Sequence, residues 1–447
     1  MIELVEKQQK HKRDILRVIW GAIDSANPES AVRECLKLRY ENLHVGNRII
    51  DLGKINNVYV IGAGKASPIM AKTAENILMR RLKGGLICTK YGHSIPLHNI
   101  NIMEADYPIP DKNSQLGAQR TLRLVGSCKA NDLIICMLSE GASALWSTPR
   151  PPIKFEDKKQ AIEALLTCGA DIHEINTVLK HISNIKGGML AEAAQPAMLI
   201  TLAISDVVGD QLPCIGSGPT TGDPTTFKNV FDIVNKYDLL PRLPSSVSDI
   251  IWDGYKKLIK DTPKPSNAAF SKNIELVIGS NKKALEVAQQ TARYLGYKVQ
   301  IVSSQLTGEA KEVGPKLVEQ ARKLSASQKP GDKPWMLLSG GETTVTLSGN
   351  GKGGRNQEMV LVAAIAMDGI DNMTFASIST DGADGLTDAA GAIADGSTMG
   401  RGKLSGHDAH KYLANDDSYN YFKAMGDLIK TGPTGTNVMD IQVLIIE

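Results

Sequence analysis

The feature that most constrains the fold is a series of short, continuous apolar runs rich in Val and Ile. Each run is followed by a turn of Gly, Ser or Asp and then by a helical pattern. Continuous rather than alternating apolar runs predict strands that are buried on both faces of a parallel sheet. The clearest runs are 58–61, 133–138, 199–204, 276–278, 299–302, 336–338 and 374–378.

Helical patterns such as 70–82 and 282–295 lie between these runs and supply the crossovers of an α/β fold. In parallel sheets, ligands bind at the carboxyl ends of the strands. The turn that directly follows each predicted strand is therefore where we expect functional residues.

The chain has 447 residues, which exceeds the usual size of one hydrophobic core and predicts two domains. The polar hexapeptide 261–266 contains two prolines and has the character of a stiff linker. We predict an α/β domain over 1–260, a linker over 261–270 and a second α/β domain over 271–447. Both are expected to be Rossmann-like, with mainly parallel sheets and flanking helices, and the last strand, 442–446, could pack on either domain.

Charge and composition exclude several classes of protein. The net charge is +3 without a long basic run, which argues against nucleic acid or a membrane surface as a partner. No stretch approaches the roughly 20 apolar residues of a membrane span, and no signal-length apolar run opens the chain. The six cysteines lack CxxC spacing. We therefore expect a cytoplasmic protein with small-molecule partners, and a homodimer is one option for its assembly.

The first turn that could bind a ligand is 62–67, directly after a predicted strand. Gly64 would let the backbone approach a ligand, the following helix N-terminus favours an anion, and Lys65 adds a cation. The turn is neither a Walker A loop nor a GxGxxG fingerprint. The alternative is a tight turn with a surface lysine.

Two further turns of small residues could bind phosphate. One contains Ser139 and Gly141, and the other contains Lys186 and Gly187. A packing turn without a ligand is the alternative interpretation of the first. His181, just upstream of the second turn, is expected to be a core or solvated histidine.

Asp206 and Asp210 lie four residues apart at the end of the strand predicted for 199–204. Carboxylates in this position can hold Mg²⁺ or accept a substrate proton. The alternative is a pair of capping aspartates.

The segment 339–358 is the most informative. It contains Gly340, Gly341 and Glu342, then a glycine-rich loop that ends in Arg355 and Asn356 at a predicted helix start. Backbone N–H groups and a guanidinium in this arrangement favour an oxyanion.

The turn 380–388 contains Asp381 and superficially resembles a calcium loop. It lacks the twelve-residue frame of an EF-hand and follows a strand. Aspartates at a strand end near a phosphate site favour Mg²⁺ with a nucleotide, so Mg²⁺ is the expected cofactor.

In combination, these motifs resemble those of the class II glycerate kinase family, the glycerate 2-kinases of the MOFRL type. The resemblance extends from about residue 25 to the end. It implies two α/β domains with an active site in the cleft between them, and transfer of the ATP γ-phosphate to the 2-hydroxyl of D-glycerate with Mg²⁺. The matching segments are GAGKA (62–66), YPIPD (107–111), the run 180–188, SDVVGD (205–210), SGPTTGDPTT (217–226), TPKP (262–265), the run 339–358, STDGADGLTDAAGA (379–392) and the run 415–440.

Three positions depart from the family pattern near the expected cleft. Glu140 stands where the family typically has a glycine, Leu179 where it has an arginine, and Asp106-Tyr107 where it has Gly-His. We expect these departures to alter substrate preference rather than abolish catalysis.

On this reading Lys65 and Arg355 meet across the cleft and clamp an anion, while Asp206 is a base or a metal ligand. Replacing either cation is expected to lower activity with little loss of melting temperature. Hydroxypyruvate reductase is an alternative that needs a dinucleotide fingerprint, and a non-catalytic sensor of a phosphorylated metabolite is another. The expected phosphate- or substrate-binding residues are Gly64, Ser139, Gly141, Lys186, Gly187, Gly340, Gly341, Glu342 and Asn356, and the expected metal ligands are Asp210 and Asp381.

Overall fold

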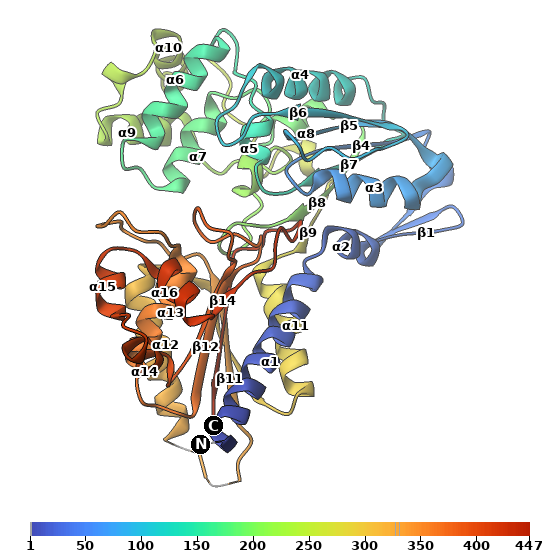
Figure 1. Ribbon diagram of the computed structural model, residues 1–447. Helices are drawn as coiled ribbons and strands as arrows, with labels where there is room; N and C mark the ends of the chain where they lie inside the picture. The colour runs from blue at the N-terminus through green and yellow to red at the C-terminus, as the bar shows by residue number, and fades with distance from the viewer. Residues whose placement is uncertain (1, 327, 330) are drawn as a thin grey trace. The chain divides into compact units, whose positions relative to one another are not determined.

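The computed structural model describes residues 2–326, 328–329 and 331–447, and these form two compact units (Figure 1). Unit 1 comprises the described residues within 1–27, 206–209 and 279–447. Unit 2 comprises 28–205 and 210–278. Each unit is built around its own six-stranded sheet, so the predicted α/β class is confirmed.

Unit 2 contains the parallel sheet that the apolar runs predicted. The strand order is β6-β5-β4-β7-β8-β9, and every pair from β6 to β8 is parallel. All side chains of β7 are buried, as expected for a strand covered on both faces. The strands are β4 (Asn57–Ala63), β5 (Leu82–Lys90), β6 (Ile100–Ala105), β7 (Asp132–Leu138), β8 (Met198–Ile204) and β9 (Ile274–Gly279).

Helices cover both faces of this sheet, with α3 (Ser67–Leu78) and α4 (Lys112–Gly126) on opposite sides (Figure 1). A separate helical layer packs around a core that includes Val178, Phe227 and Ile251. That layer consists of α6 (Phe155–Leu166), α7 (Ile172–His181), α9 (Phe227–Lys236) and α10 (Ser245–Tyr255). The remaining elements are α2 (Pro28–Cys35), α5 (Ala142–Leu145), α8 (Met189–Ala193), a small sheet of β1 (Leu36–Arg39), β2 (Asn42–Val45) and β3 (Arg48–Asp51), and the 3₁₀ turns η1 (Leu52–Lys54), η2 (Met79–Arg81), η3 (Ile215–Ser217), η4 (Leu240–Arg242) and η5 (Ala268–Phe270).

The sheet of unit 1 differs from the prediction, because only β10 and β11 are parallel. The strand order is β10-β11-β15-β12-β13-β14, and the other pairs are antiparallel. The connection 380–390 between β12 and β13 is too short for a helical crossover, so these two strands pair as neighbours in opposite directions. The strands are β10 (Lys298–Leu306), β11 (Trp335–Gly341), β12 (Met373–Ser379), β13 (Gly391–Asp395), β14 (Leu428–Ile429) and β15 (Asp440–Ile446).

Helices also cover both faces of the unit 1 sheet. α1 (Ile2–Ser25) and α11 (Asn281–Tyr294) pack together on one face, and α12 (Ala310–Ser325) and α13 (Arg355–Ala366) lie on the other (Figure 1). The remaining helices of this unit are α14 (Thr398–Leu404), α15 (Ala409–Ala414) and α16 (Ser418–Met425). No helix among the described residues has the length and apolar character needed to cross a membrane.

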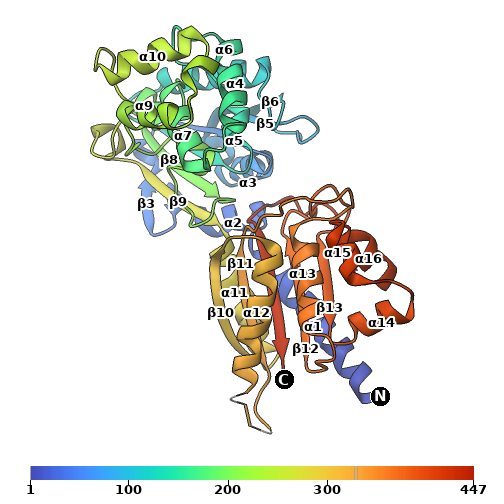
Figure 2. The same ribbon diagram turned by 90° about the vertical axis from the view of Figure 1, so that its left-hand side faces the viewer.

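The units differ from the predicted domains at both ends of the first domain. Figure 2 shows α1 beside the strands of unit 1, where Asp14 accepts a hydrogen bond from Tyr297 at 2.8 Å. The predicted linker is part of unit 2, because Thr262 is buried and donates to Asp223 at 3.0 Å. The boundary lies at the end of β9, and the last strand, β15, pairs within unit 1.

Lys158, on α6, is a fully buried lysine within unit 2, and its nitrogen donates to Thr148 O at 2.9 Å. Burial lowers the pKa of Lys158 to about 7. Between about pH 7 and the ordinary value of 10.5, the unfolded chain holds a proton that the folded chain lacks, so this group makes stability rise with pH.

Lys158→Met should therefore be more stable than the wild type at pH 7, and the difference should shrink as the pH approaches 10. Urea unfolding at several pH values measures this, with the partly exposed neighbour Lys159→Met as the control. Parallel pH profiles for Lys158→Met and the wild type would contradict the assignment.

Candidate active site

The turn after β4 packs closely against the turn after β7 in unit 2. Gly64 has φ +135°, and a β-carbon there would overlap Ser139. The Ser139 hydroxyl accepts a hydrogen bond from Ala66 N at 3.1 Å and lies 3.2 Å from the Ser67 hydroxyl. Gly64 and Ser139 are thus brought together as predicted, and Ser139 holds the start of α3 with the side chain that was expected to bind a ligand.

Lys65 is held by two of the residues at which the chain departs from the family pattern. Its ammonium forms an ion pair with Glu140 and lies 4.5 Å from the centre of the Tyr107 ring. The Tyr107 hydroxyl donates to the same Glu140 oxygen at 3.3 Å. Gly141 has φ +88°, and a β-carbon there would lie 3.3 Å from the Tyr107 ring. The predicted anion turn therefore carries an internal counterion.

Lys186 is almost completely buried, and its side chain links α5 to the 3₁₀ turn η3. Its nitrogen donates to Ser143 O at 2.6 Å, contacts the Ser143 hydroxyl and lies 3.3 Å from the Ser217 hydroxyl. Burial lowers the pKa of Lys186 well below its usual value, and Lys158 and Lys180 lower it further. The neighbouring Gly187 N–H donates to Ser217 O at 3.0 Å, so this predicted phosphate donor is used within the fold.

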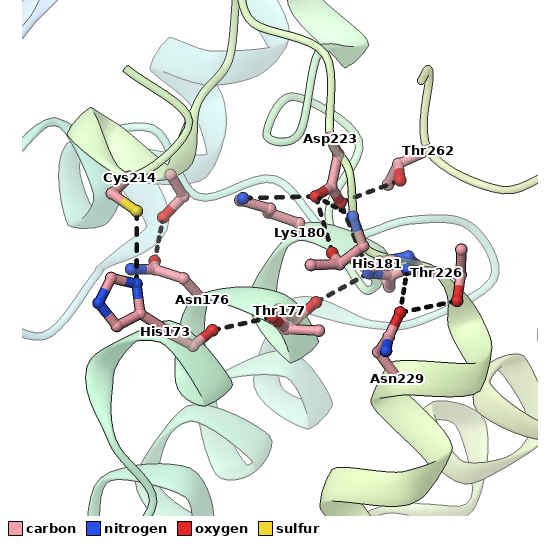
Figure 3. A network of polar contacts seen from close by, with 12 residues as sticks. His173, Asn176, Thr177, Lys180, His181, Cys214, Asp223, Thr226, Asn229 and Thr262 are labelled. Atoms are coloured by element: carbon pink, nitrogen blue, oxygen red, sulfur yellow. Dashed lines mark hydrogen bonds and ion pairs between the residues drawn. The ribbon is translucent and has the colours of Figure 1, made fainter. Parts of the chain in front are cut away.

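A buried polar network connects α7 to the segment predicted as a linker (Figure 3). Asp223 is fully buried, and Lys180 lies 3.4 Å and Thr262 3.0 Å from its oxygens. His181 bonds Thr177 O at 2.8 Å and Asp261 at 2.9 Å through its two ring nitrogens. Burial raises the pKa of Asp261, but the hydrogen bond with His181 acts in the opposite direction. The pKa of Asp261 therefore stays below its usual value. His181 is a core histidine, as predicted.

Leu179, the third departure, does not face a ligand site within unit 2. It belongs to the apolar core of the helical layer, together with Val178, Ile182 and Phe227. An arginine at this position would bury an unpaired charge, so the expectation that Leu179 affects substrate preference is not supported.

In unit 1, a buried carboxylate organises the N-terminus of α13. Asp384 accepts hydrogen bonds from Asn356 N at 3.1 Å and Gln357 N at 2.8 Å, and both amide side chains also donate to it. A β-carbon on Gly354 would overlap Asp384. Asp384 thus accepts hydrogen bonds from N–H groups of the first helical turn, and its negative charge interacts favourably with the positive end of the helix dipole. Asn356 is fully buried in this arrangement, so it positions the helix start.

Arg355, the first residue of α13, makes a bidentate ion pair with Asp440. Its Nε and Nη2 donate to the two Asp440 oxygens at 2.6 and 2.9 Å, and Nη1 lies 3.0 Å from Glu342. Asp440 has no exposed surface. Burial raises the pKa of Asp440 while the guanidinium opposes that shift, and Asp440 leaves the pKa of Arg355 above its usual value despite burial.

Gly340 and Gly341 belong to β11 rather than to a phosphate loop. They pair with Ile441 and Asp440 of β15. A β-carbon on Gly341 would overlap the backbone of Leu306, so this glycine permits the close approach of β10. Both glycines thus have a role in the sheet, and their role as phosphate donors stays a prediction.

The predicted metal ligands are placed at turns. Asp210 has φ +54° and one buried carboxylate oxygen, Oδ1, without a hydrogen-bond partner among the described residues. Asp381 accepts from the Ser379 hydroxyl at 2.7 Å and from Ala383 N at 2.9 Å, and Asp206 is partly exposed. Within the described ranges, no group of three His, Cys, Asp or Glu side chains has the geometry to hold a metal ion.

Sequence reasoning did not find the structural roles of the two carboxylates that organise unit 1, Asp384 and Asp440, and counted Asp384 only among the aspartates of a divalent-cation site. Asp384 lies in the TDGADG run, where Asp381 was chosen instead. Asp440 lies 85 residues from Arg355, and its apolar surroundings gave no sign of a charged partner. Only the strand order of unit 1 brings Asp440 to the start of α13.

Arg355→Met should destabilise the protein by about 3 kcal/mol, because it leaves Asp440 buried without its counterion. This corrects the expectation that melting would be unaffected. Arg355→Met/Asp440→Asn should recover part of the loss, whereas the exposed control Arg293→Met should melt like the wild type. A wild-type melting temperature in Arg355→Met would contradict the role of the pair.

Comparison with known proteins agrees with the motifs. Residues 14–252 match the family model described as a domain of unknown function, DUF4147, and residues 335–440 match the MOFRL family. The D-glycerate 2-kinase of Thermotoga maritima is 38% identical over 97% of this chain and 98% of its own, and the glycerate 2-kinase of Pyrococcus horikoshii is 40% identical over 96% of each. The crystal structure of glycerate kinase from Thermotoga maritima has a TM-score of 0.87, covering 98% of this chain and 100% of its own at 37% identity. The chain therefore belongs to the glycerate kinase family, with a DUF4147 domain followed by a MOFRL domain.

Proposed function

We propose that this chain transfers the γ-phosphoryl group of ATP to the 2-hydroxyl of D-glycerate, giving 2-phosphoglycerate and ADP. The observation that carries the proposal is near full-length similarity to relatives named as glycerate 2-kinases, at 38–40% identity. The cationic turn at Lys65 and the guanidinium at the start of α13 supply the charges that such a reaction needs.

Phosphoryl transfer depends mainly on positioning and on neutralising negative charge. In unit 2, Lys65 and Lys90 both lie over the ring of Tyr107, 4.5 and 5.8 Å from its centre, and form a cationic edge. In unit 1, Arg355 is held rigid by Asp440 and keeps one nitrogen on the more exposed Glu342. We assign Lys65 and Arg355 to the anions of the substrates.

The aspartates are assigned to magnesium and to the acceptor proton. Mg²⁺ bound to ATP takes one or two protein carboxylates and fills its other positions with phosphate oxygens and water. The buried, unpartnered oxygen of Asp210 and the second oxygen of Asp381 suit that donor set. Asp206 is the candidate to accept the proton of the reacting hydroxyl.

Reduction of hydroxypyruvate is the competing activity, since a relative from Agrobacterium vitis that is 39% identical is named provisionally as a hydroxypyruvate reductase. The turn after β4 ends in Ser67 where a dinucleotide fingerprint requires glycine. The Ser67 side chain is buried and donates to Met137 O at 3.1 Å, so it belongs to the packing of the turn. Phosphoryl transfer is the better-supported activity.

The purified chain should convert D-glycerate and Mg·ATP into ADP and 2-phosphoglycerate. Coupling to enolase without a phosphoglycerate mutase detects the 2-isomer alone, and a parallel assay with NADH and hydroxypyruvate tests the reductase. Exhaustive chelation should abolish turnover, and added Mg²⁺ should restore it. NADH oxidation without ADP formation would overturn the proposal.

Lys65→Met should lower kcat/KM by about 10²–10⁴ while the melting temperature stays near that of the wild type. Lys65 is partly exposed, and the Glu140 carboxylate that loses its partner keeps some exposed surface and the hydrogen bond from Tyr107. Lys54→Met, at a lysine whose side chain is 84% exposed, is the matched control. Unchanged kinetics in Lys65→Met would remove Lys65 from the site.

A further inference from the structure

The carboxylate of Glu140 is paired with Lys65, the cation that the proposed function assigns to a substrate anion. The Lys65 ammonium and the Tyr107 hydroxyl both contact Glu140 Oε1, and the side chains of Lys65 and Glu140 are 25% and 15% exposed. A ligand anion that reaches Lys65 must therefore share the ammonium with Glu140 or displace it.

The backbone fixes this arrangement. Lys65 N donates to Glu140 O at 2.9 Å, which holds the two turns together at the ends of β4 and β7. On the other side of Glu140, Gly141 lies against the Tyr107 ring so closely that a β-carbon would be 3.3 Å from it. Glu140 is thus held between its two partners, so its charge is a permanent part of this edge of unit 2.

Two ammonium groups and the Glu140 carboxylate lie against the Tyr107 side chain, and the exposed Asp106 carboxylate accepts a hydrogen bond from Tyr107 N at 2.8 Å. Lys65 and Lys90 both lie over the Tyr107 ring. Burial, followed by Lys65 and Lys90, lowers the pKa of His93, so the imidazole adds no positive charge near neutral pH. The Lys65 ammonium is already paired with one carboxylate, so a ligand group with one negative charge suits it, whereas a phosphate dianion would be repelled more strongly by Glu140.

We infer that Glu140 is a specificity-determining residue, which makes the Lys65 subsite select small hydroxy-acid monoanions and reject phosphorylated ones. This inference rests on the proposed function, which assigns Lys65 to a substrate anion, and it takes that anion to be the carboxylate of the acceptor. The contacts described above use Oε1 of Glu140, so Oε2 can accept a hydrogen bond from a ligand hydroxyl while Lys65 binds the ligand carboxylate. A phosphorylated product gains negative charge beside Glu140, which favours its release.

Calorimetric titration of the full chain without nucleotide tests the inference. In Glu140→Gln, the affinity for 2-phosphoglycerate should rise by about tenfold relative to the affinity for D-glycerate, because the repelling charge is gone while the shape is kept. Glu163→Gln is the matched control, since it makes the same substitution at an exposed carboxylate on α6 and should leave the ratio unchanged. Tyr107→Phe, which keeps the ring and the Glu140 charge, should also retain the wild-type ratio.

The outcomes separate this inference from the proposed function. An unchanged affinity ratio in folded Glu140→Gln, with normal glycerate kinase turnover, overturns the inference alone. If no turnover occurs and glycerate does not bind, inorganic phosphate is titrated in place of glycerate. Tighter phosphate binding by Glu140→Gln than by the wild type then supports the inference without the kinase assignment. If Glu140→Gln fails to fold, Glu140→Asp serves instead and should retain the wild-type ratio. If Glu140→Asp instead gained the relative affinity for the phosphorylated ligand that is expected of Glu140→Gln, the inference would be overturned, because Glu140→Asp keeps the charge.

Discussion

The close approach of two turns at adjacent strand ends is the constraint on which the unit 2 site depends. β4 and β7 are parallel neighbours, so their carboxyl ends lie at the same edge of the sheet. Gly64 has no side chain to keep Ser139 away. The Ser139 hydroxyl in turn accepts a hydrogen bond from the N–H of Ala66, directly before α3. Lys65 and Glu140 follow these two residues directly, so their ion pair is a consequence of the backbone contact. Any residue larger than glycine at position 64 would separate the turns and the charges together.

Unit 1 uses a different device at the start of α13. Two buried carboxylates, Asp384 and Asp440, hold the first helical turn and the guanidinium of Arg355. Buried carboxylates are costly unless they are paired or hydrogen-bonded, and both satisfy that requirement here. The result is an arginine whose position is set by the sheet, since Asp440 is the first residue of β15. A preorganised cation needs little rearrangement when charge develops on a substrate.

Several glycines and lysines that suggested phosphate binding are used by the fold itself. The Gly187 N–H is bonded to Ser217, Gly341 makes room for β10, and Lys186 is buried against Ser143. Glycine-rich turns at strand ends have two causes that look alike in a sequence, namely close approach of a ligand and close approach of another strand. Among the predicted cations, Lys65 in unit 2 and Arg355 in unit 1 keep an exposed part that a ligand can reach.

The sequence by itself determined the α/β class, the positions of the strands with the clearest apolar runs and the start of α13 at Arg355, because these follow from local apolar patterns and turn residues. It did not predict β5, β6 or β13. The tertiary structure alone decided the antiparallel pairing in unit 1, since strand direction depends on which strands become neighbours. It also decided the partners of the two candidate catalytic cations. Glu140 is 75 residues from Lys65 and Asp440 is 85 residues from Arg355. The burial of a strand can be predicted from a local apolar pattern. The counterion of a charged residue depends on strand order and can lie far away in the sequence, so no local pattern predicts it.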